Sequence, residues 1–313
     1  MIHTLTMNPT IDVSTTIDEM SPVNKLRGES EQRDPGGGGI NVARVLKRLG
    51  ADVTAIFPAG GATGQALRKL VDAEGIRNVT INLSEETRLS FTVLERKTGH
   101  EYRFLLPGPE ISESEWRQCL EVFAALPDRP DYVVISGSLP PGVPDDFYAR
   151  MARVANARGS KIVVDTSGPA LKAVLREKPY LIKLNFREMR ELTGEALNSP
   201  EDCLAACREV IRQGQSEIVA LTLGDKGALL VTAAGALHAG ALPIMPISTV
   251  GAGDSFLGAM LWSLMGGADL RQAFRCGVAG GSAALLRHGT ELCLADDVRR
   301  LYEEVQVREE SLA

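Results

Sequence analysis

Short β-prone runs alternate with helical patterns along much of the chain. The runs Tyr132–Ile135, Lys161–Val164 and Tyr180–Leu184 are separated by helical patterns near Pro144–Arg158 and Ala170–Arg176. Parallel strands need a crossover of a dozen or more residues, usually a helix, so few other arrangements are open to such a chain. We therefore expect an α/β fold built on an open, mostly parallel sheet.

Polar or glycine-containing loops follow four successive predicted strands. They are Ser136–Ser138, Asp165–Gly168, Asn185–Glu188 and Gly224–Gly227. The carboxyl ends of parallel strands share one edge of the sheet, and ligands bind in the crevice outside that edge. Any one polar loop could arise by chance, but four in succession favour an active site at this edge.

A glycine turn, Gly251–Asp254, runs directly into a helical pattern that starts at Phe256. The turn is expected at a helix N-terminus, where unpaired N–H groups attract anions. Because Gly251 and Gly253 lack a Cβ, the backbone can close onto a nucleotide γ-phosphoryl group. Asp254 is then a candidate general base for an attacking alcohol. The alternative is that Asp254 only caps the helix.

A second glycine run, Gly36–Gly39, precedes Ile40 and Asn41. Successive glycines let a backbone press against a ligand or form an anion-binding nest. A flexible loop is the alternative interpretation of the same residues.

Two β-prone runs, Ser90–Glu95 and Glu101–Leu106, follow one another with no helix between them. This pattern predicts a hairpin outside the parallel sheet, which projects as a flap and pairs with the polar, irregular stretch Asp12–Asp34. Arg88 and Arg103 lie on the arms of the hairpin. They are either phosphate ligands or ordinary exposed arginines on a solvated strand face.

Asn185 and Glu188 lie three residues apart at the start of a predicted helix. At this spacing they could hold Mg²⁺ through waters together with nucleotide phosphates. The same pair also fits an N-cap with a closing capping box.

The composition excludes several classes of protein. A net charge of −6 and a pI near 5.4 argue against a nucleic-acid partner. Residues 1–16 lack the unbroken apolar stretch of a signal peptide.

The uncharged run Gly227–Ile247 is interrupted by Pro243 and Pro246, so we expect buried short strands there rather than a membrane span. After a last helix at about Ala295–Val307 we expect a short acidic tail. The chain has five cysteines, and none of them forms a C-x-x-C pair. We interpret them as reduced core residues of a cytosolic protein: Cys119, Cys203, Cys207, Cys276 and Cys293.

Five motifs together resemble the signatures of the ribokinase-like (PfkB) carbohydrate kinases, and most closely their phosphofructokinase branch. They are PGGGGINVA (Pro35–Ala43), FPAGGATG (Phe57–Gly64), SGSLPPG (Ser136–Gly142), NxxE (Asn185–Glu188) and STVGAGD (Ser248–Asp254). The likeness runs from Leu5 to about Tyr302.

The resemblance implies a single kinase domain over residues 1–313. Its fold would be an α/β, three-layer α/β/α sandwich with a mainly parallel central sheet and a small β-sheet lid from segments at about 10–35 and 87–107. It further implies ATP as phosphoryl donor, Mg²⁺ and often a monovalent cation such as K⁺. The expected partners are a sugar phosphate and ATP, with no nucleic acid and no membrane, in a cytoplasmic protein that forms a homodimer through the lid.

The resemblance also assigns site residues. Asp254 matches the catalytic base, and Gly251, Ala252 and Gly253 match the anion hole. Positions for the phosphorylated sugar are matched by Asp12, Lys25, Gly37, Gly38, Gly39, Asn41, Arg88, Arg103 and Ser138. Nucleotide-binding positions are matched by Lys183, Asn185, Thr222, Gly224, Asp225, Lys226, Gly227, Val278 and Ser282. Glu188 matches the magnesium motif, and the monovalent-cation loop corresponds to Ser248, Val250, Ala284, Arg287, Gly289 and Glu291.

Two residues depart from the pattern of the family. Leu184 stands where many relatives have proline, and Arg287 stands where close relatives carry a smaller polar residue, which bears on the cation site.

Residues and resemblance together favour ATP-dependent phosphorylation of fructose 6-phosphate to fructose 1,6-bisphosphate. Fructose 1-phosphate and tagatose 6-phosphate are alternative substrates. A non-catalytic nucleotide or sugar-phosphate sensor is the alternative of another class, although a sensor has no need of Asp254. An oxidoreductase is disfavoured, because no acidic residue follows a first-unit glycine motif at the spacing of a dinucleotide site.

Overall fold

The structure, a computed structural model, describes residues 1–310. In this part of the chain the larger sheet has 10 strands in the order β14-β13-β12-β11-β10-β9-β8-β1-β4-β5. From β5 to β11 along this order neighbouring strands are parallel, and β12, β13 and β14 are antiparallel. The bounds are β1 Ile2–Leu5, β4 Val53–Gly60, β5 Arg77–Leu83, β8 Tyr132–Ser136, β9 Lys161–Asp165, β10 Leu181–Asn185, β11 Ile218–Thr222, β12 Ala228–Thr232, β13 Gly235–Ala239 and β14 Val307–Glu310. The expected mainly parallel sheet is confirmed.

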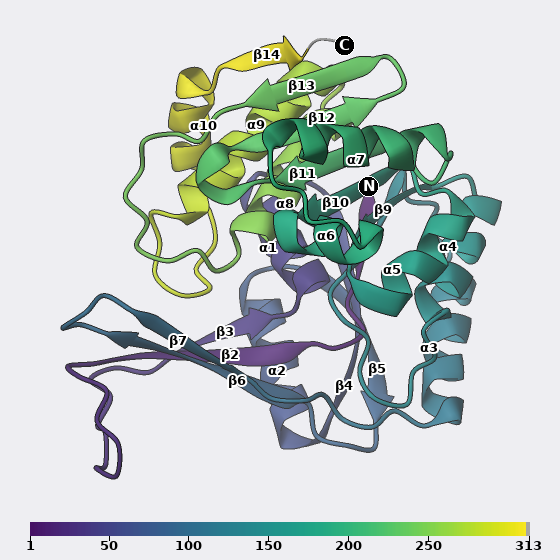
Figure 1. The fold of residues 1–313 in the computed structure, drawn as a ribbon. Coiled ribbons are helices and arrows are strands. Elements are labelled where there is room, and N and C mark those ends of the chain that lie inside the picture. The colour runs from purple at the N-terminus through teal and green to yellow at the C-terminus, as the bar shows by residue number, and fades with distance from the viewer. Residues whose placement is uncertain (311–313) are drawn as a thin grey trace.

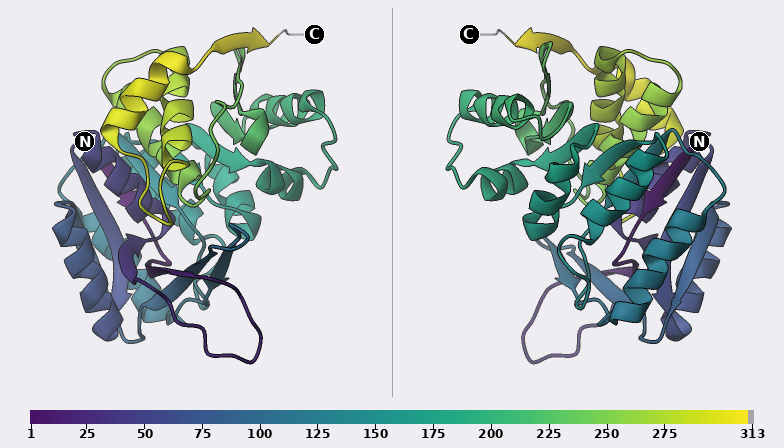
Figure 2. Two further views of the ribbon diagram at one scale, coloured as in Figure 1. Left: turned by 90° about the vertical axis from the view of Figure 1, so that its left-hand side faces the viewer. Right: turned by 90° about the vertical axis from the view of Figure 1, so that its right-hand side faces the viewer.

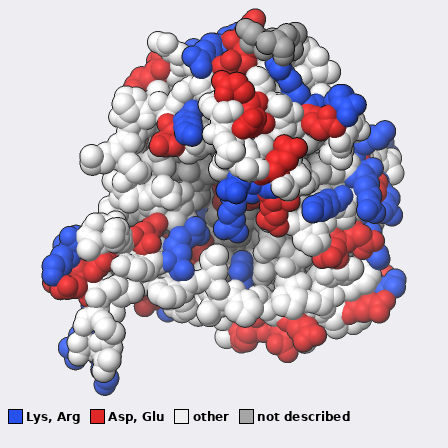
Figure 3. Space-filling view, in the orientation of Figure 1, with Lys and Arg blue, Asp and Glu red and all other residues white. Residues whose placement is uncertain are grey.

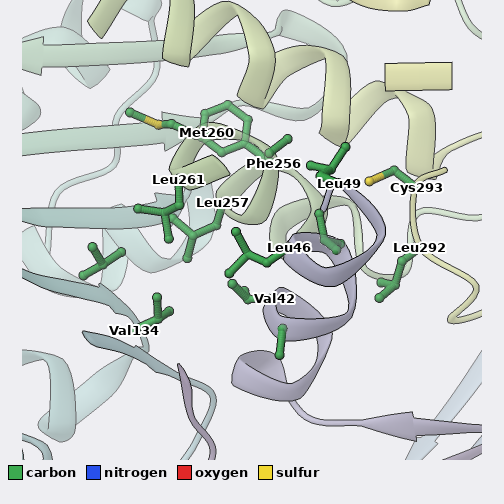
Figure 4. Close-up of a cluster of buried hydrophobic side chains, with 14 of the residues drawn as sticks. Val42, Leu46, Leu49, Val134, Phe256, Leu257, Met260, Leu261, Leu292 and Cys293 are labelled. Carbon is green, nitrogen blue, oxygen red and sulfur yellow. The ribbon is translucent and has the colours of Figure 1, made fainter. Parts of the chain in front are cut away.

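Helices cover both faces of this sheet (Figures 1 and 2). One face carries α1 Gly38–Arg48, α2 Gly61–Ala73, α8 Ala252–Met265, α9 Leu270–Ala284 and α10 Ala295–Glu304. The other carries α3 Glu113–Ala125, α4 Phe147–Ala157, α5 Gly168–Val174, α6 Phe186–Thr193 and α7 Pro200–Arg212. Alternate strand residues supply the two cores, since Val134 packs with α1 and α8 (Figure 4) while Val133 and Ile135 pack on the opposite side. The three-layer α/β/α sandwich is confirmed.

A second sheet has four strands in the order β3-β2-β6-β7 and projects from the body (Figure 1). Its strands are β2 Thr10–Ile17, β3 Gln32–Gly36, β6 Arg88–Glu95 and β7 Glu101–Leu105. The hairpin β6–β7 is confirmed, and its pairing with the preceding polar stretch is confirmed by the parallel register of β2 with β6.

Two expectations about irregular or terminal segments were wrong, and a third was confirmed in part. The stretch 12–34 is not irregular throughout, because β-branched residues in β2 let residues 12–17 form a strand despite their polarity and residues 32–34 belong to β3, while residues 18–31 form a loop extending from the sheet (Figure 2). The expectation of buried short strands in the run 227–247 is confirmed for β12 and in part for the half-buried β13, although the run ends in an exposed segment in which Met245 is 91% exposed. Residues 307–310 are not a free tail, since β14 pairs with β13.

The five cysteines are free and buried. Burial raises the pKa of the Cys119 and Cys276 thiols to about 12. The interpretation of these residues as reduced core residues is confirmed. None of the helices in residues 1–310 is both long enough and apolar enough to cross a membrane.

Candidate active site

A buried lysine and aspartate mark the carboxyl edge of the sheet between β9 and β10. Asp165 ends β9, and its two carboxylate oxygens accept hydrogen bonds of 3.1 and 3.3 Å from Lys183 Nζ in β10. Both side chains are about nine-tenths buried. A buried ion pair of this kind keeps an ammonium group fixed at this edge of the sheet, where it can meet an anion.

The turn before α8 lies against this lysine. Gly251 adopts the left-handed conformation, with φ of 71°, and is the N-cap of α8, which glycine tolerates because it lacks a Cβ. A Cβ on Gly253 would lie 2.6 Å from Lys183 Nζ. The expected helix N-terminus is confirmed, and the ammonium group stands directly beside it.

Asp254 lies in the first turn of α8, and its carboxylate accepts a hydrogen bond from a residue of α1. Asn41 Nδ2 donates a hydrogen bond of 2.9 Å to Asp254 Oδ2. Burial and the neighbouring Asp165 charge raise the pKa of Asp254 to about 7, against the opposing influence of Asn41 and Lys183. The interpretation of Asp254 as a helix cap was wrong, since the N-cap is Gly251 and no side chain caps it.

The second glycine run is packed rather than flexible. Gly37 is the N-cap of α1 with φ of 108°. A Cβ on Gly38 would lie 2.2 Å from Ser136 Oγ, and one on Gly39 would lie 2.6 Å from the Leu5 carbonyl oxygen. The flexible-loop alternative was therefore wrong: glycine lets the start of α1 approach the ends of β1 and β8, which brings Asn41 to Asp254.

The second sheet contributes charged side chains at its base. Arg88 Nη1 donates to the Leu106 carbonyl at 3.1 Å and Nη2 donates to the Asn8 carbonyl at 3.0 Å, while its buried Nε has no partner. Arg103 is exposed. Burial raises the pKa of Asp12 to about 6, and the charges of Arg103 and Arg88 oppose that rise. Arg88 is thus half-buried rather than solvated, and the three charged groups are electrostatically coupled.

The remaining residues predicted for the sugar divide into two groups. Ser138 Oγ accepts a hydrogen bond of 3.3 Å from Asn8 Nδ2 and so lies beside the base of the second sheet. Lys25 lies in the exposed loop 18–31, apart from the cluster. Asn8 was missed as a site residue, although its Asn-Pro turn directly after β1 could have indicated it.

The residues predicted for the nucleotide border the same edge. Asn185 ends β10 and Thr222 ends β11 at the paired register position. The residues Gly224–Lys226 form an exposed 3-10 turn after β11, and Gly227 follows with φ of 90°. Val278 and Ser282 lie on α9.

The capping-box interpretation of Asn185 and Glu188 is confirmed, because each side chain bonds the other residue's backbone N–H, at 2.9 and 2.8 Å. Burial and the Asp165 charge raise the pKa of Glu188. Burial alone would lower the pKa of Lys183, but the charges of Asp165, Glu188 and Asp254 raise it. Three carboxylates therefore act electrostatically on one ammonium group, which Asp165 alone contacts directly, and Asp165 is the member of this set that the sequence analysis did not assign.

This carboxylate set suits Mg²⁺, which takes one or two carboxylates together with waters and substrate phosphates. No group of three or more metal-ligating side chains that could hold an ion unaided is found in residues 1–310.

The segments predicted for a monovalent cation meet near the base of α8. Ser248 Oγ donates to both Glu101 carboxylate oxygens, at 3.0 and 3.1 Å. Arg287 forms an ion pair with Asp297, which neutralises its charge, and Arg48 donates to the Glu291 carbonyl. Backbone carbonyl oxygens are ligands that suit K⁺, and the Glu291 carbonyl already accepts from Arg48.

Basic and acidic side chains lie side by side around the hollow between the second sheet and the body (Figure 3). The sequence matches the pfkB family of carbohydrate kinases over residues 5–297. The chain belongs to the pfkB family of carbohydrate kinases.

Several members of the pfkB family are similar over nearly the whole chain. The ATP-dependent 6-phosphofructokinase isozyme 2 of Mycobacterium tuberculosis is 42% identical over 302 residues, covering 96% of this chain and 89% of the relative. The 1-phosphofructokinase of Bacillus subtilis is 32% identical, with coverage of 98% and 99%. The crystal structure of Escherichia coli phosphofructokinase-2 in complex with potassium is 40% identical and superposes with a TM-score of 0.92 over 97% of this chain and 98% of that one. A tetrameric inhibited form of the same E. coli protein superposes with a TM-score of 0.90, with coverage of 97% and 98%.

Proposed function

We propose that this carbohydrate kinase transfers the γ-phosphoryl group of ATP to fructose 6-phosphate, giving fructose 1,6-bisphosphate. The observation that carries the proposal is Asp254, a carboxylate with a pKa of about 7 beside the N-terminal turn of α8. A base whose pKa lies near the working pH is substantially ionised and still able to take a proton. The name of the M. tuberculosis relative supports the choice of sugar.

In the reaction, Asp254 takes the proton of the attacking hydroxyl while Asn41, at 2.9 Å, orients its carboxylate. The backbone N–H groups of Gly251, Ala252 and Gly253, with the Lys183 ammonium beside them, stabilise negative charge on the transferring group. Mg²⁺ bound with the nucleotide supplies further neutralisation of phosphate charge, and Glu188 and Asp165 would hold it through waters.

The sugar phosphate binds between the body and the second sheet, which serves as a lid of the single domain 1–313. Asp12, Asn41 and Ser138 would form hydrogen bonds with the hydroxyl groups of the sugar. The glycines Gly37–Gly39 would let the sugar approach the start of α1. Arg88 and Arg103 would hold its phosphate, since guanidinium donors match phosphate oxygens. Closure of the lid excludes water, which competes as phosphoryl acceptor. Lys25 would reach the site from the loop 18–31.

The nucleotide would lie along Asn185, Thr222, the turn Gly224–Gly227 and α9. We assign K⁺ to the segments 248–250 and 284–291. Three observations support the assignment of K⁺: these segments offer backbone carbonyl oxygens, the charge of Arg287 is compensated by its ion pair with Asp297, and the E. coli protein was crystallised in complex with potassium.

We also propose a homodimer formed through the lid. Phe91 and Phe104 are opposite each other in the β6–β7 register and are 37% and 48% exposed, which is an unusual apolar pair for a solvated strand face. A cytoplasmic location fits the five free thiols, because that compartment is reducing.

The test is ADP release by the purified protein with ATP, Mg²⁺ and a panel of fructose 6-phosphate, fructose 1-phosphate, tagatose 6-phosphate and fructose. We expect the largest kcat/KM with fructose 6-phosphate. Preference for fructose 1-phosphate would instead assign the activity of the B. subtilis relative. ATP binding without turnover of any sugar would indicate a sensor.

Asp254→Asn is the matched variant for the same assay. It should fold and bind ATP but lose roughly 10²–10⁴ in kcat, the range for removing a positioned base. Retention of more than about a tenth of wild-type kcat would remove Asp254 from the mechanism.

A further inference from the structure

A fully buried arginine on α1 joins the second sheet to the segment 290–292. Arg44, 1% exposed, donates to Asp34 Oδ1 at 3.1 Å, to Glu74 Oε1 at 2.9 Å and to the Thr290 carbonyl at 2.9 Å. Asp34 belongs to β3, and Glu74 follows α2. Four acceptors from three segments, the Pro35 carbonyl of β3 included, thus meet at one guanidinium group.

The hydroxyl of Thr290 adds a direct hydrogen bond between Asp34 and the segment 290–292. Thr290 is 3% exposed, and its Oγ1 donates to Asp34 Oδ2 at 3.0 Å. Asp34 lies directly opposite Asp12 in the β2–β3 register. The same aspartate therefore stands beside a residue assigned to the sugar and bonds a residue of the distant segment 290–292.

That segment continues to the anion hole. Leu292 is fully buried with φ of 63°, a left-handed conformation that is strained for a residue with a side chain. Its Cδ2 would lie 2.3 Å from a Cβ on Gly251, so its side chain packs against the Gly251 backbone. The next residue, Cys293, donates its N–H to Ser255 Oγ at 3.3 Å in α8.

We propose that Thr290 is a positioning residue of the kinase. Its bond to Asp34 holds the segment 290–292 in its strained conformation against Gly251, and so couples the sugar side of the site to the anion hole. This inference rests on the proposed function for its catalytic consequence, but the coupling itself is a property of the chain without ligands. The Thr290 hydroxyl bonds Asp34, which is not itself assigned to the sugar or to the anion hole, so Thr290 acts through Asp34 and Leu292.

Thr290→Val tests the inference, because valine keeps the shape and removes the hydroxyl. Hydrogen exchange of the ligand-free protein should become about tenfold faster in the segments 288–294 and 252–258, the factor expected when a hydrogen bond to a charged group is lost. With the sugar phosphate that the wild type prefers, kcat should fall about tenfold. Thr290→Ser, which keeps the hydroxyl, should show the wild-type exchange rates and the wild-type kcat.

Thr4→Val is the matched control, since Thr4 is a buried threonine of β1 whose Oγ1 has no partner. It should change neither measurement. If Thr290→Val does not fold, Thr290→Ala carries the same test, because it also removes the hydroxyl and leaves the ion pair of Asp34 with Arg44 in place.

The inference is overturned if exchange stays at the wild-type rate, if Thr4→Val has the same effect, or if serine does not restore the rates. Faster exchange with unchanged kcat would also overturn it, since the bond would then be structural only. A wild type that phosphorylates none of the sugars would defeat the proposed function instead, and the exchange measurement would still decide the coupling.

Discussion

At the scale of residues, the site depends on an excess of negative charge around one lysine. Asp165, Glu188 and Asp254 share the single ammonium of Lys183, and Asp165 alone bonds it directly. Without a bound ligand, burial therefore leaves Asp254 and Glu188 incompletely compensated, and their pKa values rise. Such a site gains a base at the working pH but loses stability when that base ionises.

The first prediction concerns the pH dependence of stability. Between pH 4 and 7 the folded protein keeps a proton on Asp254 that the unfolded chain has lost, so wild-type stability falls as pH rises through this window. Asp254→Asn removes this dependence. We expect the difference in Tm between Asp254→Asn and the wild type to be more favourable to the variant at pH 8 than at pH 5, by roughly 2–4 °C. Thermal melts at the two pH values measure the difference.

The control is Asp145→Asn, an exposed aspartate outside the site. Its Tm relative to the wild type should be the same at both pH values. An equal Tm difference for Asp254→Asn at pH 5 and pH 8 would show that the carboxylate titrates as an ordinary aspartate.

The second prediction concerns Glu188→Gln. The amide keeps an oxygen for the capping box with Asn185 but removes the charge. We expect the Mg²⁺ concentration for half-maximal activity to rise several-fold with little change in maximal kcat, because a water-mediated ligand tunes the metal. A magnesium titration of initial rates measures this, and unchanged magnesium dependence would leave Glu188 as a capping residue only.

At the scale of elements, the strands with continuous apolar runs could be predicted from the sequence. The predictions for β8, β9 and β10 differ from the structure by about one residue at an end. The polar strand β2 could not be predicted, since its alternating Thr, Ser and Asp side chains look like a loop until another sheet pairs with them. The short charged strand β14 forms only because the edge of β13 accepts it.

The candidate site was predictable to a similar extent. The glycine turn and Asp254 could be assigned from local pattern, because a helix N-terminus is a local property. The contact of Asn41 with Asp254 spans 213 residues, and the pairing of Asp165 with Lys183 depends on the order of strands in the sheet. Neither contact has a local sequence signal, which is why Asp165 was not assigned.

The third prediction separates the two arginines of the second sheet. Replacing either Arg88 or Arg103 by alanine should cost about 1.5–3 kcal/mol of phosphosugar binding, or roughly 10–150-fold in kcat/KM, with little change in the KM for ATP. Only Arg88→Ala should also lower Tm, because Arg88 bonds the Leu106 and Asn8 carbonyls. Steady-state kinetics and thermal melts on both variants measure these effects.

Arg33→Ala is the matched control. Arg33 is exposed on β3 and lies opposite Val13, on the other face of the same sheet from Asp12. Its kcat/KM should equal that of the wild type. If Arg88→Ala and Arg103→Ala lost nothing, or if free fructose matched the sugar phosphates, the phosphosugar assignment would fail.

At the scale of the whole molecule, the second sheet, which we propose serves as a lid, is the part with the least support from the body. It extends from the sandwich as four strands, and β7 leaves one edge without a neighbouring strand in residues 1–310. Unpaired edges and exposed aromatic side chains favour association with another chain. A second copy of the same lid would cover both at once.

The fourth prediction follows from this geometry. The wild type should sediment as a dimer at micromolar concentration, and Phe104→Lys should shift it to the monomer, because it places a charge in the apolar patch. Sedimentation velocity at several concentrations measures the change. Met245→Lys, at a residue 91% exposed outside the lid, should leave the dimer intact. A monomeric wild type, or an unchanged Phe104→Lys assembly, would contradict the interface.

The buried thiols give the folded state a chemical signature. Alkylating reagents attack the thiolate, and burial both shields these sulfurs and raises the thiol pKa. The cysteines lie in both cores, Cys119, Cys203 and Cys207 on one side of the sheet and Cys276 and Cys293 on the other. Labelling by iodoacetamide therefore reports when each layer opens, and mass spectrometry of the labelled peptides would show whether the two halves of the sandwich open together or one before the other.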